Sequence, residues 1–329
     1  MRQMALALIV TAGLVAGSAG PAPVVAQQKP IEIRFGHVGF PGSLFDRTAN
    51  EFAKRVNEAL KGRVEMKVFH SSQLGTDADM LKGIKVGTLE MFLPSTIMST
   101  VDDLFGAWEM PYLIRDRKHL TAVTRDPEVR AALFDRLPAK GVRALAWWEN
   151  GFRHVTNNVR PIRAPEDLKG IKLRTPRGVW RVKMFQAYGA SPTPLSFAEV
   201  YSALQTGVMD GQENPFAQIH SGKFQEVQKY MSLTGHVYTP GYPVVGEKWW
   251  GSLPADVRQV IERIANEMTE WIHATSVGME NELKDPLCAK MACNEVDKQA
   301  FIRASKPIYE EFGTKVPGGK ELIAKVQAL

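Results

Sequence analysis

The sequence has little of what usually marks an enzyme or a metalloprotein. The motifs HExxH, GxSxG and GxGxxG and the phosphate-binding loop are all absent from its 329 residues. The seven histidines are scattered along the chain, and the acidic pair Asp102-Asp103 is more typical of a helix cap than of a catalytic dyad. The sequence therefore predicts no catalytic residue, no cofactor and no metal site.

Cysteine is also scarce in this chain. Cys288 and Cys293 are the two cysteines of the chain, and their spacing fits neither a CxxC redox motif nor a common zinc pattern. If both lay on one helix, their side chains would diverge, so a disulfide requires a turn between them. The sequence leaves the disulfide and the two free thiols both open.

The chain has only a small excess of positive charge. Lys and Arg number 41 against 35 Asp and Glu, which gives a net charge of +6, and no basic block occurs. This pattern argues against nucleic acid as a partner, whereas a mildly basic chain suits an anionic small molecule. The hydrophobic fraction of 44% and the charged fraction of 23% are those of an ordinary globular protein, long enough for two domains.

A long hydrophobic run is also missing after the N-terminus. Residues 1–26 begin with Met1-Arg2, continue as a mostly apolar run and end in small or branched side chains at Val24-Val25-Ala26. The run is shorter than the roughly 20 apolar residues that span a bilayer. We therefore interpret 1–26 as a secretory signal peptide rather than a membrane anchor, and expect a soluble, exported, monomeric protein.

Strand-like and helix-like segments alternate along most of the chain, which predicts an α/β fold. The alternation starts with a strand at 31–38 and restarts near residue 152. Further segments predict a helix over 117–137, a strand over 142–148 and a helix from about Ser252 to Asp285 that Pro286 ends. That last helix would reach roughly 48 Å, long enough to pack along two lobes.

Polar and aromatic side chains gather where the predicted strands end, which is where ligands bind in doubly wound sheets. The candidates are Gln73, Asp77, Trp147, Trp148, Asn150, Arg153, Arg174, Asn214, Tyr238 and Tyr242. Arginine pairs with a carboxylate through a planar fork, and aromatic walls exclude water. The set predicts a cleft that binds an organic acid.

Arg174 is the most informative of these residues. In "IKLRTPRG" (171–178), Ile171 and Leu173 alternate with Lys172 and Arg174, and Pro176 stops the strand because it has no N–H to donate. The arginine is either an ordinary solvated or ion-paired charge or the receptor of an anion, and the pattern alone does not separate these. Arg177, beyond the proline, is interpreted as a solvated charge, and at least one of Trp147 and Trp148 is expected in the core.

The chain resembles the solute-binding proteins of tripartite ATP-independent periplasmic (TRAP) transporters, in the branch that binds dicarboxylates and sialic acid. The resemblance covers the whole mature chain and rests most on "DLKGIKLRTP", "GASPTPLSFAEVYSALQTGVMDGQENP" and "KFQEVQKYMSLTGHVY". It implies two α/β lobes, each a mixed sheet flanked by helices, with a ligand cleft between them and a long helix across both. We expect lobe I at 27–151 plus 240–279 and lobe II at 152–239 plus 280–329.

The resemblance also implies roles for individual residues. The arginine of "LRTP", Arg174, pairs with the ligand carboxylate, assisted by Arg153 in "NGFRHVTN" and by Asn214 in "GQEN". Phe197 in "SFAEVY" packs on the ligand, and Asp77 after "SQLG" lies near it. The sialic acid binders carry glutamate where this chain has Ser95, which argues against sialic acid, and Trp148, Tyr238 and Tyr242 suggest a smaller or flatter acid.

Three functions follow from these residues. The preferred one is a periplasmic binding protein, not an enzyme, that passes an organic carboxylate to a TRAP membrane permease. A periplasmic enzyme on the same fold would need a base in the cleft, for which His154 and Asp77 are candidates. A ligand sensor that docks to a membrane receptor would share the site and differ only in its partner.

Overall fold

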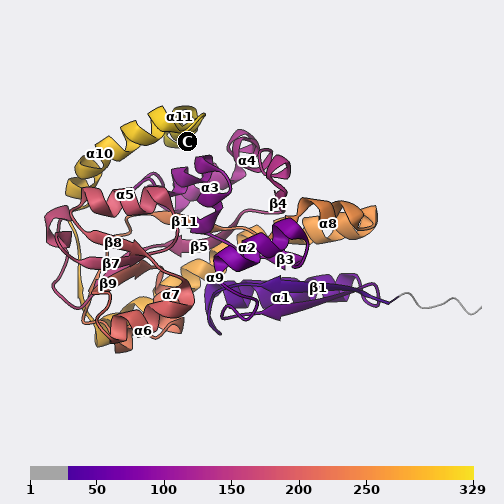
Figure 1. Cartoon of the computed structure of the whole chain (residues 1–329), viewed down its shortest axis with the longest axis horizontal. Helices are drawn as coiled ribbons and strands as arrows, with labels where there is room; N and C mark the ends of the chain where they lie inside the picture. Colours follow the sequence, from indigo (N-terminus) through magenta and orange to yellow (C-terminus); the bar gives the residue numbers. More distant parts are fainter. Residues whose placement is uncertain (1–28) are drawn as a thin grey trace, which may run out of the picture.

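The computed structural model describes residues 29–329, so the predicted signal peptide lies outside the described residues. Two mixed sheets form the frame of the molecule, one in each half of Figure 1. The first sheet has the order β2-β1-β3-β12-β4, with β1 (Ile31–Gly36), β2 (Val64–Phe69), β3 (Met91–Phe92), β12 (Val244–Gly246) and β4 (Val142–Ala144). In it, β1 is parallel to β2 and β3, and β12 is antiparallel to β3 and β4.

The second sheet has the order β13-β10-β6-β9-β7-β8. Its strands are β13 (Ala292–Asn294), β10 (Tyr230–Ser232), β6 (His154–Asn157), β9 (Gly211–Asn214), β7 (Lys172–Thr175) and β8 (Ser191–Pro194). Strand β9 is parallel to β7 and antiparallel to β6. A separate antiparallel pair, β5 (Trp148–Phe152) with β11 (Tyr238–Gly241), completes the strands of the described residues.

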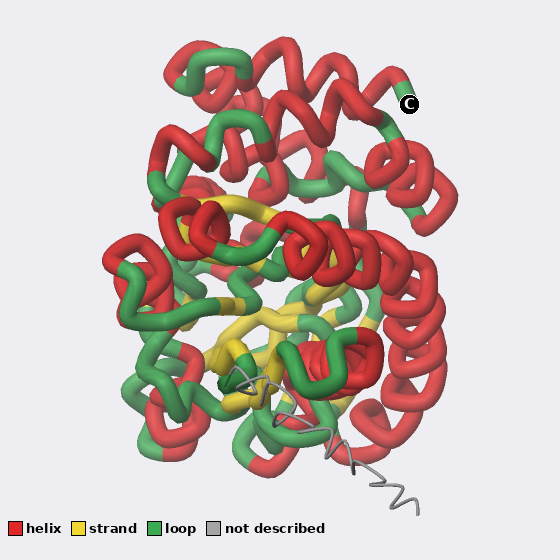
Figure 2. Tube along the Cα trace, turned by 90° about the vertical axis from the view of Figure 1, so that its right-hand side faces the viewer, coloured by secondary structure: helices red, strands yellow, loops and turns green. Residues whose placement is uncertain are grey.

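Helices surround these strands, which Figure 2 shows in the interior. The α-helices are α1 (Leu44–Ala59), α2 (Asp77–Val86), α3 (Arg117–Arg125), α4 (Pro127–Phe134), α5 (Val179–Ala187), α6 (Val200–Gln205), α7 (Phe216–Ser221), α8 (Glu247–Ser252), α9 (Ala255–Lys290), α10 (Lys298–Lys315) and α11 (Gly319–Ala328). The 3₁₀ helices are η1 (Thr96–Thr100), η2 (Asp103–Glu109), η3 (Pro138–Lys140), η4 (Pro165–Leu168), η5 (Phe197–Glu199) and η6 (Phe224–Glu226).

The long helix α9 contacts elements of both halves. It packs on α1 beside the first sheet and on α7 and β13 in the second half. Ile261, Met268 and Ile272 keep the helical period and are buried in one core with Phe35 and Phe52. The predicted α/β architecture with a long helix across both halves is therefore confirmed.

Pro286 does not end α9, contrary to the prediction from sequence. The helix continues four residues further, to Lys290. A proline removes one helical hydrogen bond and frees the carbonyl four residues earlier, here that of Glu282. Both Pro286 and Glu282 are exposed, so water can reach that carbonyl, while Leu283 and Leu287 are buried and hold the last turns on the protein.

The two cysteines lie on either side of the end of α9, and they are bonded to each other. Cys288 lies in the last turn of the helix and Cys293 in strand β13, so the chain turns between them. The two form a disulfide with Cα atoms 5.3 Å apart. Of the two states that the sequence left open, the bonded one is present.

Two other predicted elements are each divided in the structure. The helix predicted at 117–137 breaks at Asp126, whose carboxylate caps α4 by accepting from the backbone N–H of Glu128 and Val129 at 2.9 Å. The strand predicted at 142–148 is shared between β4 and β5, which belong to different sheets. Pro127 supports the first break because proline suits the first position of a new helix.

Candidate functional site

A cavity of about 50 Å³ lies between the two sheets, at the carboxyl ends of their parallel strands. From the first half it is lined by Val38 after β1, by the start of α2, and by the segment after β3. From the second half it is lined by residues that end or follow β7, β8 and β9. The polar lining residues are Thr76, Asp77, Ser95, Thr96, Asn150, Arg153, Arg174, Arg177, Ser196, Asn214 and Gln218.

Arg174 lies at the end of β7 and is 3% exposed. Its Nε and one Nη donate to the carbonyl oxygen of Leu195 at 2.9 and 2.6 Å. Within residues 29–329 no carboxylate forms a salt bridge with it, and Phe197 lies 5.9 Å from its guanidinium carbon. Burial, followed by the nearby charge of Arg153, lowers the pKa of Arg174 to about 9. A buried cation that forms no salt bridge is suited to receive an anion.

Arg153 lines the same cavity but already has an acidic partner. Its Nε donates to Glu213 Oε2 at 2.5 Å, and Arg181 donates to both oxygens of the same carboxylate at 2.8 and 2.9 Å. His236 Nε2 lies 3.1 Å from Glu213. Burial by itself raises the pKa of Glu213, but Arg153 and Arg181 hold it well below its ordinary value. Glu213 therefore compensates much of the charge of Arg153.

Asp77 is the first residue of α2 and faces the arginines. Thr76 and Asp79 form the capping box of this helix, so Asp77 is not needed for capping. Burial raises the pKa of Asp77 to about 6, although Arg174 and Arg177 act in the opposite direction. The cavity therefore offers both guanidinium donors and a carboxyl group whose pKa is raised to about 6.

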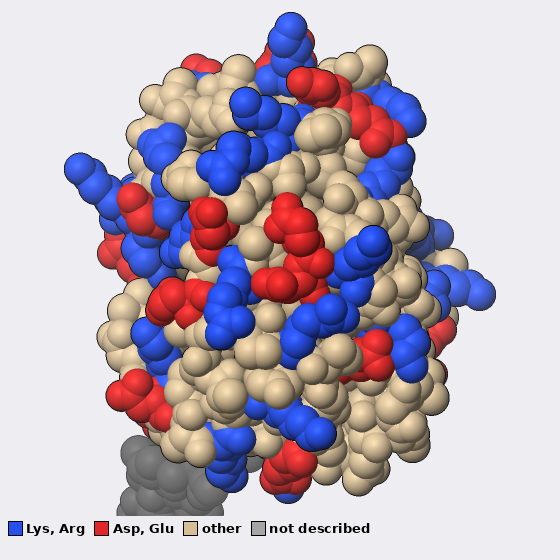
Figure 3. All heavy atoms as spheres, turned by 90° about the vertical axis from the view of Figure 1, so that its left-hand side faces the viewer, with Lys and Arg blue, Asp and Glu red and all other residues tan. Residues whose placement is uncertain are grey.

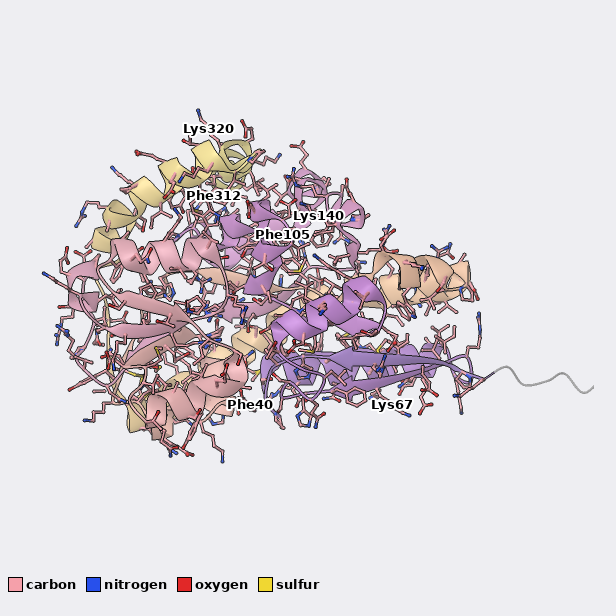
Figure 4. All side chains as sticks on the ribbon, in the orientation of Figure 1. Phe40, Lys67, Phe105, Lys140, Phe312 and Lys320 are labelled. Atoms are coloured by element: carbon pink, nitrogen blue, oxygen red, sulfur yellow. A yellow bond between two sulfur atoms is a disulfide. The ribbon has the colours of Figure 1, made fainter. Side chains whose placement is uncertain are left out.

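Neutral polar groups complete the lining. Gln218 donates to the Oδ1 of Asn150 at 3.2 Å, and Asn214 donates through Nδ2 to the Oε1 of Gln212 at 2.5 Å. The ring centroid of Phe197 lies 5.4 Å from that of Phe40, which Figure 4 labels at the junction of the two halves. The site thus combines cationic donors, amides, hydroxyls and an aromatic wall, which is a set suited to a small polar anion.

Five of the eight predicted ligand residues line the cavity, namely Asp77, Arg153, Arg174, Phe197 and Asn214. The other three do not. Gln73 is exposed in the turn that follows β2. Trp148 is fully buried against Phe35 and Phe52, and its Nε1 donates to the carbonyl of Ala265 on α9 at 2.8 Å.

Tyr238 is also a core residue, and its ring centroid lies 5.3 Å from that of Phe152. The ring centroid of Tyr242 lies 5.4 Å from that of Phe105. Trp148, Tyr238 and Tyr242 therefore do not line the cavity, contrary to the prediction, and the structure gives no support for a smaller or flatter acid from them. The sequence pattern could not separate them, because the end of a strand can face the cavity or the core, and large aromatic side chains fill cores readily.

Two further lining residues were misjudged or missed. Arg177 is exposed, as expected of a solvated charge, but it also lines the cavity. Its position three residues after Arg174, beyond the turn at Pro176, was the available signal. Gln218 on α7 carried no recognisable signal, because its place depends on how α7 packs beside β9. His154 lies outside the lining, stacked on Phe216 at 4.3 Å.

The described part of the chain contains no cluster of three or more His, Cys, Asp or Glu residues that could hold a metal ion. No helix in residues 29–329 is long and apolar enough to cross a membrane. On the face at the left of Figure 1, Figure 3 shows basic and acidic side chains interspersed.

Comparison with protein families tests the resemblance noted in the sequence. Residues 35–315 match the sequence model of the bacterial extracellular solute-binding proteins, family 7. The chain belongs to this family. Its members are substrate-binding proteins of TRAP transporters rather than enzymes.

Individual members support this assignment. The C4-dicarboxylate-binding periplasmic protein DctP of Rhodobacter capsulatus is 32% identical over 93% of this chain and 92% of its own length. A TRAP periplasmic solute-binding protein from Polaromonas sp. JS666 with bound D-erythronate superposes with a TM-score of 0.87. It is 32% identical, and the match covers 91% of this chain and 99% of that one. A similar protein of Sulfurospirillum deleyianum with bound succinate has a TM-score of 0.85, 33% identity and coverage of 91% and 98%.

Proposed function

We propose that this protein is a periplasmic solute-binding protein that captures an organic acid through its carboxylate and delivers it to a TRAP membrane permease. The observation that supports this most is the buried guanidinium of Arg174, which lines the cavity and donates its hydrogen bonds to a backbone carbonyl and not to an acid. The ligand carboxylate would supply the missing negative charge. Relatives that bind succinate and D-erythronate support the same ligand class.

The cavity position suggests how binding proceeds. Asp77 and Ser95 come from the first half of the chain and Arg174 and Asn214 from the second. We propose that the two halves, 27–151 plus 240–279 and 152–239 plus 280–329, open to admit the acid and close on it. A ligand that contacts both halves favours the closed state, because its affinity for that state is higher.

A thermal-shift screen with paired compounds tests the proposal. Succinate, D-erythronate, D-gluconate and phenylacetate are compared with analogues that lack the carboxylate, such as 1,4-butanediol for succinate and erythritol for D-erythronate. Binding to the native state raises the melting temperature, so at least one acid should shift it and its neutral analogue should not. Equal shifts by an acid and its neutral analogue would overturn the role of the carboxylate.

A second measurement addresses the enzymatic alternative. His154, one of its two candidate bases, lies outside the cavity lining, whereas Asp77 lines it. We expect the bound acid to be recovered unchanged by mass spectrometry after prolonged incubation with the protein. Conversion of the acid would contradict the proposed function.

A further inference from the structure

Three buried side chains lie behind Asn214 without lining the cavity. They are Thr156, Gln212 and Gln228, each at most 4% exposed. Gln228 follows η6, Thr156 lies on β6, and Gln212 lies on β9 two residues before Asn214. Buried polar groups need hydrogen-bond partners, and these three bond to one another and to Asn214.

The sheet register explains how they meet. Thr156 on β6 is directly opposite Gln212 on β9, and Gln212 is also paired with Arg174 on β7. Paired residues on adjacent strands share a face, and residues two apart on one strand do so as well. Thr156, Gln212, Asn214 and Arg174 therefore belong to one face of the second sheet.

The donor and the acceptor of each hydrogen bond in this group follow from the backbone carbonyls that Gln228 contacts. Gln228 Nε2 donates to the carbonyls of Asp210 and Val227 at 3.3 and 3.1 Å. Because a carbonyl can only accept, the amide nitrogen of Gln228 must be on that side, and its Oε1 accepts from Thr156 Oγ1 at 2.9 Å. A hydroxyl has one proton, so Thr156 Oγ1 must in turn accept from Gln212 Nε2, at 2.9 Å.

The last hydrogen bond of the series joins Gln212 to Asn214, which lines the cavity. Since Gln212 uses its nitrogen on Thr156, its Oε1 is the atom that faces Asn214 and accepts from Asn214 Nδ2 at 2.5 Å. The Asn214 amide is thereby held with its nitrogen on Gln212. A flip of the amide would place two acceptor oxygens, Asn214 Oδ1 and Gln212 Oε1, against each other.

We propose that Gln228, Thr156 and Gln212 form a relay of positioning residues that fixes the amide orientation of Asn214 for ligand binding. The relay presents the second N–H and the Oδ1 of Asn214 in fixed directions before the acid arrives. It reduces the ordering that binding would otherwise require. The inference rests on the proposed function for its effect on affinity, but the relay itself is a property of the ligand-free protein.

The first test therefore needs no ligand. The side-chain amide protons of Asn214 are observed by ¹⁵N–¹H NMR and assigned through their loss in Asn214→Asp. Thr156→Val removes the relay hydroxyl at nearly constant shape, and we expect the Asn214 signals to shift and to exchange faster with solvent. Thr156→Ser should restore them. Unchanged Asn214 signals in Thr156→Val would overturn the relay.

The second test measures affinity by calorimetry for succinate and D-erythronate. Loss of one ordered hydrogen-bond partner predicts binding about 5- to 10-fold weaker in Thr156→Val. Ser305→Ala is the matched control, because Ser305 is an equally buried hydroxyl on α10 that bonds to Tyr188 and to the Phe301 carbonyl. It should lower the melting temperature without weakening binding. If Thr156→Val does not fold, Gln228→Met removes the far end of the relay instead.

The outcomes separate the two proposals. If the wild type binds an acid and the relay variant, Thr156→Val or its replacement Gln228→Met, binds it equally well, the positioning role is wrong while the proposed function stands. If the wild type binds neither acid and the wider screen finds none, the proposed function fails, and the NMR result alone decides whether the relay exists.

Discussion

Arg174 and Arg153 are two buried arginines of the same cavity, and they differ in what compensates their charge. Arg153 is bonded to Glu213, which also holds Arg181, whereas Arg174 is held by the carbonyl of Leu195. A buried charge with its partner inside the protein contributes to the structure, and one without a partner is available to a ligand. The difference distinguishes a structural arginine from a binding one more sharply than their burial, which is nearly equal.

The largest expected effect comes from removing the partner of Arg153. Glu213→Gln removes the carboxylate to which the guanidinium groups of Arg153 and Arg181 are both bonded, and breaking such a buried pair costs about 3–5 kcal/mol of unfolding free energy. Urea denaturation measures the change. The control is Glu267→Gln on α9, which breaks an exposed pair with Arg263 and should change stability by less than about 1 kcal/mol. Equal changes in the two variants would contradict the structural role.

Replacing Arg174 is expected to weaken ligand binding rather than the stability of the fold. Arg174→Ala should weaken binding of an acid found in the screen by about 100-fold or more, because the ligand carboxylate would be buried without its partner. The free energy of unfolding without ligand should not fall as it does in Glu213→Gln. Arg174→Lys keeps the charge but loses the planar fork, so intermediate affinity is expected by calorimetry. Normal affinity in Arg174→Ala would refute the site.

Asp77 offers a way to sharpen the comparison through pH. Its pKa of about 6 lies above the usual value of 3.8, so the folded state binds more protons than the unfolded state between those values. Unfolding free energy should therefore fall as pH rises from about 4 to about 6, and the slope should flatten in Asp77→Asn.

The same titration should affect binding. Below pH 6, protonated Asp77 no longer offsets the charge of Arg174, so the affinity for an ionised acid should rise by a few-fold per proton bound. Calorimetry at pH 5.5 and 7.5 on the wild type and Asp77→Asn checks this. A pH dependence that persists in Asp77→Asn would assign it to another group.

The smallest effect is expected at Arg177, the exposed arginine of the cavity. Solvent and salt screen its charge, so Arg177→Gln should reduce affinity only about 2- to 3-fold. The loss should disappear in 0.5 M NaCl, whereas the loss in Arg174→Ala should remain. A salt-independent loss at Arg177 would instead show that it touches the ligand directly.

Local patterns were sufficient for much of the fold and part of the site. The alternation in "IKLR" and the stop at Pro176 place Arg174 at a strand end, and strand ends of parallel sheets meet at the cavity. The same reasoning placed Trp148 at the end of a predicted strand, yet it begins β5, and Tyr238 begins β11, and both side chains lie in the core. Which way a side chain at such an end points depends on what packs against the sheet, and one strand of sequence does not contain that information.

By itself, the sequence determined the α/β alternation and the position of Arg174 at a strand end, because strand and helix periods and proline chemistry act over a few neighbouring residues. The family followed from the resemblance of longer motifs. Only the tertiary structure decided that Glu213 is bonded to Arg153 and not to Arg174, that α9 passes Pro286, and that Cys288 bonds to Cys293. These outcomes depend on burial and on partners distant in the chain. Electrostatic compensation in particular is set by which charges the fold brings within a few ångströms of one another.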